Sequence, residues 1–340
     1  MQVISKKKIY FPVTEPLREY LAQHRRKADI PVSYSDLTRF SESIPLLDKN
    51  GQDTLWETVI YNGELAAEIN AGMAIIYSLL KAAGDLSQRA HLVVDRIDCC
   101  VFGNTKPFRV RIVNQFNDNY DYFYVKKADS SRIYGLELEE LLSPSRIHFL
   151  VKGETLIEEH ISGIPGDRFL NGYLERTNRN LVRVAKEFIK FNERCFVRLL
   201  GDMRAYNYVV DITPDFEDEQ YRVRPIDFDQ QSYEGGKNIY LPQFFKDNNP
   251  VVKLCLELLN IETMRQYQSE ERTLMAQRFY AVHDQIKDLI SCMKHNDIST
   301  KVKVAQLRKE LSLFHGDSQL LKANTMGEIL YTHIVKCLDK

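Results

Sequence analysis

The chain has 340 residues, which is enough for one large two-lobed domain or for two to three small ones. Hydrophobic residues make up 44% and charged residues 27%, ordinary globular values that exclude bulk disorder. Lys and Arg number 46 against 47 for Asp and Glu, so no overall field draws the chain to nucleic acid or to an anionic membrane.

The six cysteines are scattered and form no Cys-x-x-Cys pair, which favours a reduced intracellular protein over a disulfide framework or a zinc module. The N-terminus lacks the apolar core of a signal peptide, and the longest apolar stretch is too short to span a bilayer. We therefore expect a cytoplasmic protein with no nucleic-acid or membrane partner. The oligomeric state is left open.

Residues 1–90 are predicted to form a mostly helical N-terminal extension. Its clearest segment is 53–83, where apolar residues recur at intervals of three, four or seven. Thr54 and Glu57 have the spacing of a capping box, and Gly84 would end the helical segment. The role of this extension is left open.

Residues 91–163 change to a β-rich character. Turn-forming stretches separate three strand-like runs, which predict an antiparallel meander. A helical stretch and two further strand-like runs follow, so the predicted order is β-β-β-α-β-β. These runs are "HLVVDRIDCCVF", "FRVRIVNQF", "YDYFYVKKA", the helical "SRIYGLELEELL", then "RIHFLVKG" and "TLIEEHISG".

Residues 164–340 are predicted to be mainly helical. An amphipathic helix, "LVRVAKEFIKFNERCF", leads into a hairpin of "YNYVVDI" and "YRVRPIDFD", and four or five helices follow from about residue 249. The hairpin would present Asp202, Asn207 and Asp227 at one rim. Two carboxylates and an amide oxygen suit Mg²⁺, and phosphoryl transfer needs such a set.

Three motifs resemble the protein-kinase-like superfamily, in the style of its aminoglycoside phosphotransferase and small-molecule kinase branches. "GDMRAYN" is similar to the catalytic loop GDxxxxN, "IDFD" to the metal-binding IDF motif, and "LIEEHISG" to the last small-lobe strand and hinge. The resemblance covers roughly residues 91–300 and is one of pattern and order. It implies an α+β, two-lobed fold with a small antiparallel β lobe carrying one helix (91–163) and a larger, mainly helical lobe (164–340).

The resemblance also implies roles for individual residues. Asp202 would be the catalytic aspartate and Arg204 a cation on the transferred phosphate, while Asn207 and Asp227 would bind Mg²⁺. Adenine would meet the backbone around the hinge, at Glu159, His160 and Ile161. The implied activity is ATP- and Mg²⁺-dependent transfer of the γ-phosphoryl group to a hydroxyl of a small molecule or a protein.

A lysine on the third strand of such a fold binds the α- and β-phosphates and is held by a helix glutamate. Lys126 and Lys127 end that strand and point to opposite faces. We favour Lys126, because it follows an aliphatic residue, and expect Glu137, 11 residues later, as its partner. Glu140 lies on nearly the same helical face, whereas Glu139 is rotated away.

Three departures from the family pattern leave alternatives open. The loop "VFGNTKPF" has a single glycine, so the side chain of Lys106 would supplement a loose phosphate cradle. Leu200 stands where many relatives have a bracing histidine, and Asp229 stands at the glycine of the metal motif, either as a further metal or water contact or without a role. The alternatives are a catalytically inactive kinase-like binding module and a nucleotidyl-transferring enzyme.

A second His-Gly-Asp sequence, in "FHGDSQLLKAN", is superficially closer to the antibiotic-kinase loop. Its nearest asparagine, Asn324, is seven residues beyond Asp317 rather than five, and no strand or acidic motif follows. We interpret Asp317 as a helix cap or a loop residue.

Overall fold

The chain divides into two compact units, which are described separately. Among the described residues, the sheet unit comprises 8–129 and Ile147–His160, and the helical unit comprises Ser130–Arg146 and 161–339. The computed structural model describes residues 8–81, 91–101, 105–174, 180–216 and 218–339.

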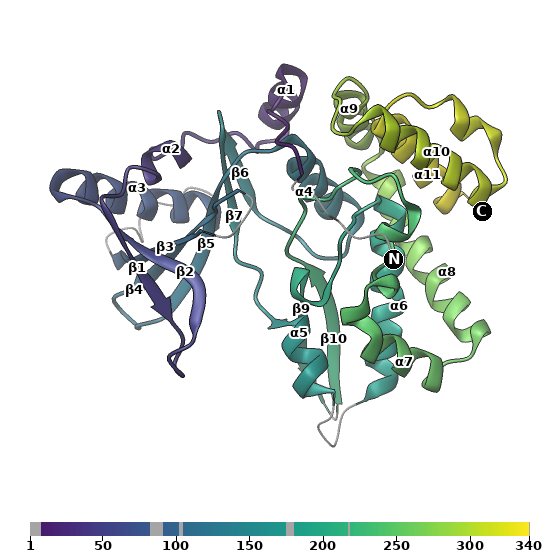
Figure 1. Cartoon of the computed structure of the whole chain (residues 1–340), viewed down its shortest axis with the longest axis horizontal. Coiled ribbons are helices and arrows are strands. Elements are labelled where there is room, and N and C mark those ends of the chain that lie inside the picture. Colours follow the sequence, from purple (N-terminus) through teal and green to yellow (C-terminus); the bar gives the residue numbers. More distant parts are fainter. Residues whose placement is uncertain (1–7, 82–90, 102–104, 175–179, 217, 340) are drawn as a thin grey trace. The chain divides into compact units, whose positions relative to one another are not determined.

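The sheet unit is built on a seven-stranded antiparallel sheet with the order β1-β2-β3-β4-β5-β7-β6 (Figure 1). The strands are β1 (Glu42–Leu47), β2 (Asp53–Ile60), β3 (Leu92–Cys100), β4 (Phe108–Asn114), β5 (Tyr120–Lys127), β6 (Phe149–Lys152) and β7 (Thr155–Glu159). Its helices are α1 (Glu15–Gln23), α2 (Tyr34–Leu37) and α3 (Gly63–Lys81).

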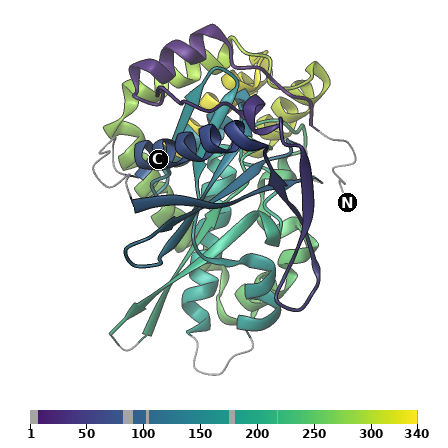
Figure 2. The ribbon, with the colours of Figure 1, turned by 90° about the vertical axis from the view of Figure 1, so that its left-hand side faces the viewer.

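One face of this sheet is covered by α3 (Figure 2). Val110, Phe123 and Val125 of β4 and β5 are fully buried in a core that also contains Met73 and Ile76 of α3. Because side chains alternate along a strand, the residues between these apolar positions belong to the opposite face of the sheet. Lys126 is therefore placed on the face that α3 does not cover.

The prediction that a helical segment begins at Asp53 is wrong for its first part, because residues 53–60 form β2. The Thr54 hydroxyl donates to the carbonyl of Leu46 at 2.6 Å, across the β1–β2 hairpin, instead of capping a helix. The helix itself begins at Gly63. Since Thr58 of β2 pairs with β3, residues 42–60 extend the main sheet rather than forming a separate helical extension.

The helical unit contains a small sheet of order β10-β9-β8, with strands β8 (Ile164–Pro165), β9 (Tyr208–Asp215) and β10 (Asp218–Pro225). Its helices are α4 (Ser130–Leu142), α5 (Gly166–Arg168), α6 (Leu181–Arg198), α7 (Asn249–Leu258), α8 (Ile261–Ala281), α9 (His283–Lys294), α10 (Lys301–His315) and α11 (Met326–Leu338). Single turns are η2 (Phe169–Tyr173), η3 (Ala205–Asn207), η4 (Lys237–Tyr240), η5 (Pro242–Phe244), η6 (Lys246–Asn248) and η7 (Ser318–Lys322).

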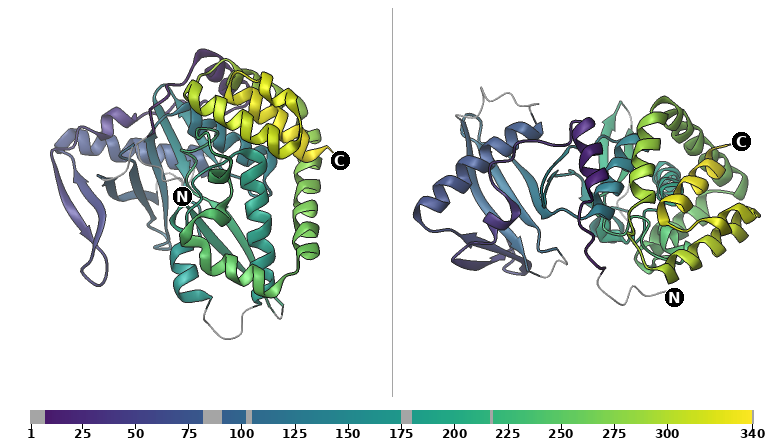
Figure 3. Two further views of the ribbon diagram at one scale, coloured as in Figure 1. Left: turned by 45° about the vertical axis from the view of Figure 1, so that its right-hand side comes forward. Right: turned by 90° about the horizontal axis from the view of Figure 1, so that it is seen from above.

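The central element of this unit is α6, which packs against α7, α8 and β10 (Figure 3). Asn180 caps its first turn by accepting from the backbone of Arg183 at 3.2 Å. Near its end, the fully buried Arg198 forms an ion pair with Glu139 of α4. A buried arginine held by a carboxylate fixes the end of α6 against α4 and so fixes the start of the loop that follows.

The mixed α and β class predicted from the sequence is confirmed. The strands at 92–127, the helix at 130–142, the hairpin after residue 207 and the helices after residue 249 are all present. The grouping of α4 differs, because it clusters with the helical unit although it lies between strands in the sequence. Its contacts with α8 and α9 explain why nearly all its residues are buried.

In the part of the chain that the structure describes, no helix has the length and apolar character required to cross a membrane.

Candidate active site of the helical unit

The loop after α6 begins with a strained backbone. Leu199 ends the helix in the left-handed region at φ +52°, and Asp202 adopts φ +58°. A left-handed conformation costs a residue other than glycine about 1–3 kcal/mol and persists where the surroundings fix it. Such strain is concentrated at functional sites, so Asp202 is a candidate for a positioned catalytic group.

A second segment of the chain braces this loop. The backbone of Gly201 donates to the carbonyl of Gln230 at 3.2 Å, and Asp202 donates to the carbonyl of Ile239 at 3.2 Å. The fully buried Gln231 donates from its amide to the carbonyl of Arg198 at 2.6 Å. Gln231 thus fixes the residues at the start of the loop. No short sequence pattern indicates this role, because it depends on a contact with Arg198, 33 residues earlier in the chain.

Three residues of the loop are joined by short polar contacts. The Arg204 guanidinium donates to the carboxylate of Asp202 at 2.9 Å. The side-chain amide of Asn207 donates to the carbonyl of Asp202 at 2.8 Å, and its backbone N–H donates to the carbonyl of Arg204 at 2.9 Å. These bonds close residues 202–207 into a compact turn, because Asn207 bonds back to Asp202 and Arg204. The last part of this turn is η3.

The hairpin brings the metal motif to the same place. Tyr208 opens β9 and pairs with Pro225, the last residue of β10. The backbone of Ile226 donates to the carbonyl of Asn207 at 3.0 Å, directly before Asp227. Residues 25 positions apart in the sequence, Asp202 and Asp227, are thereby held at one end of the hairpin, as the sequence predicts.

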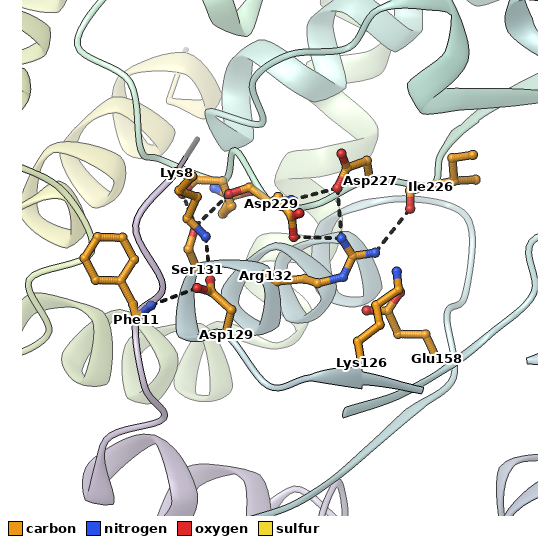
Figure 4. A network of polar contacts seen from close by, with 11 residues as sticks. Lys8, Phe11, Lys126, Asp129, Ser131, Arg132, Glu158, Ile226, Asp227 and Asp229 are labelled. Carbon is orange, nitrogen blue, oxygen red and sulfur yellow. Dashed lines mark hydrogen bonds and ion pairs between the residues drawn. The ribbon is translucent and has the colours of Figure 1, made fainter. Parts of the chain in front are cut away.

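The two aspartates of the "IDFD" motif share a cation. Arg132, in the first turn of α4, places Nη1 2.8 Å from Oδ1 of Asp227 and 2.8 Å from Oδ1 of Asp229 (Figure 4). Its Nη2 donates to the carbonyl of Ile226 at 3.3 Å, and the backbone of Asp229 donates to Oδ1 of Asp227 at 3.1 Å. Arg132 is 3% exposed. One buried guanidinium therefore bridges Asp227, which the resemblance assigns to a metal, and Asp229, whose role the sequence leaves open.

The carboxyl group of Asp202 has an unusual acidity. Burial raises its pKa from the ordinary 3.8 to about 6, and the nearby negative charges of Asp227 and Glu234 act in the same direction. The hydrogen bond and charge of Arg204 act against this rise. A carboxylate with a pKa near 6 is a stronger base than an ordinary aspartate, which suits a group that receives a proton from an alcohol.

In the sheet unit, Lys126 is the buried lysine of the two candidates. Its Nζ lies 2.8 Å from Oε2 of Glu158 on the neighbouring β7 (Figure 4). The same Nζ lies 5.3 Å from the ring centre of Tyr124. The side chain of Lys127 is 39% exposed and lies over the ring of Tyr10. Glu158 is a partner that the sequence pattern does not indicate, because it lies on a neighbouring strand 32 residues later in the chain.

The three glutamates of α4 have different surroundings. Glu137 is fully buried, and its predicted pairing with Lys126, which belongs to the sheet unit, stays a prediction. Glu139 forms an ion pair with Arg198 inside the helical unit. Glu140 is partly exposed near the end of α4. Glu139 therefore has a structural role.

The predicted hinge falls at the boundary between the two units. Glu159 ends β7, where its carboxylate accepts from the backbone of His148 at 2.8 Å and pairs with Lys81 at 3.4 Å. His160 is the last residue of this part of the sheet unit, and Ile161 is the first of the helical unit. Burial lowers the pKa of His160 below its ordinary 6.5, so its ring is neutral at pH 7.

The predicted phosphate loop is described only in part. Lys106 is exposed, with φ at +42°, and its carbonyl accepts from the hydroxyl of Tyr34 at 3.2 Å. Residues 102–104, including the single glycine of that loop, lie outside the described residues. Asp317, of the second His-Gly-Asp sequence, is expected to be a helix cap or a loop residue. Its carboxylate accepts from the backbone of Gln319 at 2.8 Å and caps η7.

The donor chemistry of the helical unit fits a hard divalent cation. The carboxylates of Asp202, Asp227 and Asp229 are oxygen donors, and the hydrogen bond from Nδ2 of Asn207 fixes the orientation of its amide. Mg²⁺ prefers such oxygen ligands. The structure adds Arg132 to this set, and its charge already offsets one of the two negative charges of the motif.

No protein family model matches the chain, and no curated protein matches its sequence. Among solved structures, the chain is similar to the autoinhibited serine kinase domain of the giant muscle protein titin. The TM-score is 0.25 and the sequence identity 11%, with 68% of this chain and 88% of that chain covered. At this identity and TM-score, the similarity assigns neither a family nor an activity.

Proposed function

We propose that the protein is an ATP- and Mg²⁺-dependent phosphotransferase with a kinase-like fold, acting on a hydroxyl of a small molecule or a protein. The observation that supports it best is the end of the hairpin in the helical unit. There a strained, partly desolvated Asp202 lies in one bonded loop with Arg204 and Asn207, next to the aspartates of a second motif.

The chemistry of these residues follows from their surroundings. Asp202 orients the acceptor hydroxyl and takes its proton as the new O–P bond forms and the bond to the β-phosphate oxygen breaks, leaving ADP. Arg204, fixed by Asp202, offers a cation where negative charge spreads over the transferred group. Asn207 and Asp227 would hold Mg²⁺, which neutralises the phosphates.

In this proposal, the sheet unit supplies the nucleotide contacts. Lys126 would meet the α- and β-phosphates, with Glu158 keeping its ammonium in place. The backbone at 159–161 would receive adenine, and Lys106 would add a phosphate contact. These assignments rest on the sequence resemblance and on the burial of Lys126.

Turnover with water as the acceptor tests the proposal without knowledge of the natural substrate. The full chain is incubated with ATP and Mg²⁺, and the products are separated. Release of ADP and phosphate, abolished by Asp202→Ala and by Asp227→Ala, supports phosphoryl transfer. Release of pyrophosphate would instead indicate nucleotidyl transfer, and turnover that survives either substitution would contradict the site.

A second candidate is a catalytically inactive kinase-like binding module. It is favoured by Arg132, which already provides a positive charge to Asp227 and Asp229. Such a protein would bind ATP without releasing ADP, and its binding would not depend on Mg²⁺. A thermal shift with ATP in the presence and in the absence of Mg²⁺ separates the two functions.

A further inference from the structure

Three potential metal ligands gather between the last two helices of the helical unit. His315 ends α10, and His333 and Cys337 lie on α11. Their ligand atoms all lie within 4.8 Å of one another. Nε2 of His315 lies 2.8 Å from Nδ1 of His333, and Sγ of Cys337 lies 3.8 Å from the same Nδ1. The two helices lie side by side (Figure 3).

The helices explain why these residues meet. His333 and Cys337 are four positions apart and therefore share one face of α11. His315 is the last residue of α10, where Gly316 adopts φ +64° and ends the helix. The sequence pattern does not indicate this site, because a single His-Cys pair is not a metal-binding motif and the third ligand comes from another helix.

The protonation of the two rings is fixed by their surroundings. Nε2 of His333 lies 3.0 Å from the carbonyl of Phe196, so this nitrogen carries the hydrogen and donates. Nδ1 of His333 then carries a lone pair and faces Nε2 of His315. An electropositive centre must sit between these nitrogens, either a hydrogen on His315 or a metal ion bound by both.

The bond to Phe196 is the arrangement that metal-bound histidines adopt. Such a histidine donates its second ring N–H to a carbonyl or carboxylate, which fixes the ring and its tautomer. The edge of the Phe196 ring also packs on His333, with ring centres 4.8 Å apart. His333 is therefore held in one orientation, with Nδ1 facing Nε2 of His315, while Sγ of Cys337 lies 3.8 Å from Nδ1 and 3.7 Å from Nε2 of the same ring.

Two of the three ligand separations can be compared with those of a tetrahedral zinc centre. Bonds of about 2.0–2.1 Å to nitrogen and about 2.3 Å to sulfur place ligand atoms about 3.3–3.6 Å apart. The separation of 3.8 Å between Sγ of Cys337 and Nδ1 of His333 is near this value, and the two ring nitrogens, at 2.8 Å, would move apart by about 0.5 Å. The sulfur also lies 3.7 Å from Nε2 of His333, so metal binding requires the Cys337 side chain to rotate toward the Nδ1 side of the ring.

We propose that His315, His333 and Cys337 form a zinc site that joins α10 to α11. Two imidazoles and a thiolate match the preference of Zn²⁺ for nitrogen and sulfur ligands, and three protein ligands leave a fourth position for water or another ligand. Binding releases the thiol proton of Cys337 to solvent as the sulfur–zinc bond forms. This site is independent of the proposed phosphotransfer.

The test measures metal in the full-length protein. The chain is incubated with ZnCl₂, passed through gel filtration and analysed for zinc by mass spectrometry. We expect about one zinc per chain in the unaltered protein and at least about tenfold less in Cys337→Ser. Cys255→Ser is the matched control, because that buried cysteine lies elsewhere, against the carbonyl of Ala185, and this variant should keep its zinc.

Cobalt gives a second readout that does not depend on activity or on the Cys337 variant folding well. Co²⁺ bound to a thiolate has an intense charge-transfer absorption, which the unaltered chain and Cys255→Ser should show. His315→Gln, at the partly exposed end of α10, should weaken it while the far-ultraviolet dichroism stays unchanged. Unaltered protein that retains no zinc, or a Cys337→Ser or His315→Gln variant that retains as much as the unaltered protein, would overturn the proposal.

Discussion

Asp202 combines a left-handed backbone with a partly desolvated carboxyl group. Backbone hydrogen bonds from Gly201 and Asp202 to the segment at 230–239 hold the residue in its left-handed conformation. Burial raises the pKa of its carboxyl group to about 6. An aspartate that only caps a turn needs no such rise in pKa, so the combination makes Asp202 a candidate for a chemical role.

The acidity of Asp202 predicts an unusual dependence of activity on pH. If Asp202 must be ionised to receive the hydroxyl proton, the rate of ADP release should fall as the pH drops through about 6 rather than through about 4. Initial rates between pH 5 and pH 8 check this expectation. A rate that stays constant down to pH 4.5 would show that the ionised carboxylate is not needed.

The raised pKa of Asp202 also predicts how the free energy of unfolding depends on pH. Because the folded pKa of Asp202 lies above 3.8, the folded chain retains its proton between about pH 4 and pH 6, and stability falls as the pH rises through that window. Asp202→Asn removes this cost, so the variant should gain up to about 3 kcal/mol at pH 7.5 and almost nothing at pH 4. Urea unfolding at both pH values provides the comparison. A loss of stability at pH 7.5 would contradict the raised pKa.

The ion pairs of Arg132 with Asp227 and Asp229 lead to a prediction about divalent cations. Replacing it by Gln leaves Asp227 beside Asp229 without their shared guanidinium and should lower the free energy of unfolding by about 1–3 kcal/mol. Mg²⁺ or Ca²⁺ should restore part of this loss by binding the exposed carboxylates. Thermal unfolding with and without the cation measures the effect.

The control for that experiment is Arg265→Gln, a change at an exposed arginine on α8. It should leave both the melting temperature and the response to Mg²⁺ close to those of the unaltered chain. If Arg132→Gln gains no more from Mg²⁺ than this control does, the guanidinium does not take the place of a divalent cation.

At the scale of elements, the contact of α5 and η3 places the loop against the hairpin. Gly166 lies so close to them that an added Cβ would stand 2.2 Å from the Tyr208 ring and 2.4 Å from the carbonyl of Ala205. Gly166→Ala should therefore displace the turn that carries Asn207 and lower the free energy of unfolding by about 2 kcal/mol or more. It should also reduce ADP release.

Gly172→Ala is the matched substitution, since an added Cβ there meets nothing within 4 Å. Its melting temperature should stay within a few degrees of that of the unaltered chain. Equal effects of the two alanines would mean that the close contact of Gly166 with Tyr208 does not position the loop.

The sequence predicted those elements whose signals are local. The hairpin of β9 and β10 and the alternation in β5, which places Lys126 opposite the core, could be read from β-rich runs and turn formers. The β1–β2 hairpin could not, because helical spacing after Gly63 hid the alternation of residues 53–60. Pairing of Thr58 with β3, 40 residues away, decides that segment.

The sequence likewise indicates only some residues of the candidate site. Asp202, Asn207 and Asp227 carry a recognisable spacing. Arg132 and Gln231 carry none, since each acts through a partner distant in the sequence. The residues that hold a site are chosen by packing, and packing between distant segments has no short pattern.

At the scale of the whole molecule, the proposed residues are divided between two units. Asp202, Arg204, Asn207 and Asp227 belong to the helical unit, and Lys126 belongs to the sheet unit. A nucleotide that needs both sets should protect amides in both units from hydrogen exchange. Exchange measured with and without ATP and Mg²⁺ should therefore slow at β5 and at 201–207 together. Slowing confined to one unit would contradict the nucleotide contacts proposed for the other unit.

Calorimetric titration of the full chain with ATP and Mg²⁺ tests the central proposal most directly. The unaltered protein should bind the nucleotide, Asp227→Asn should weaken binding at least about tenfold, equivalent to about 1.4 kcal/mol, and Asp317→Asn should leave it unchanged. The last change is the control, because Asp317 caps η7 and belongs to the second His-Gly-Asp sequence, outside the proposed site. Failure of the unaltered chain to bind, or equal binding by Asp227→Asn, would contradict the proposed ATP- and Mg²⁺-dependent site.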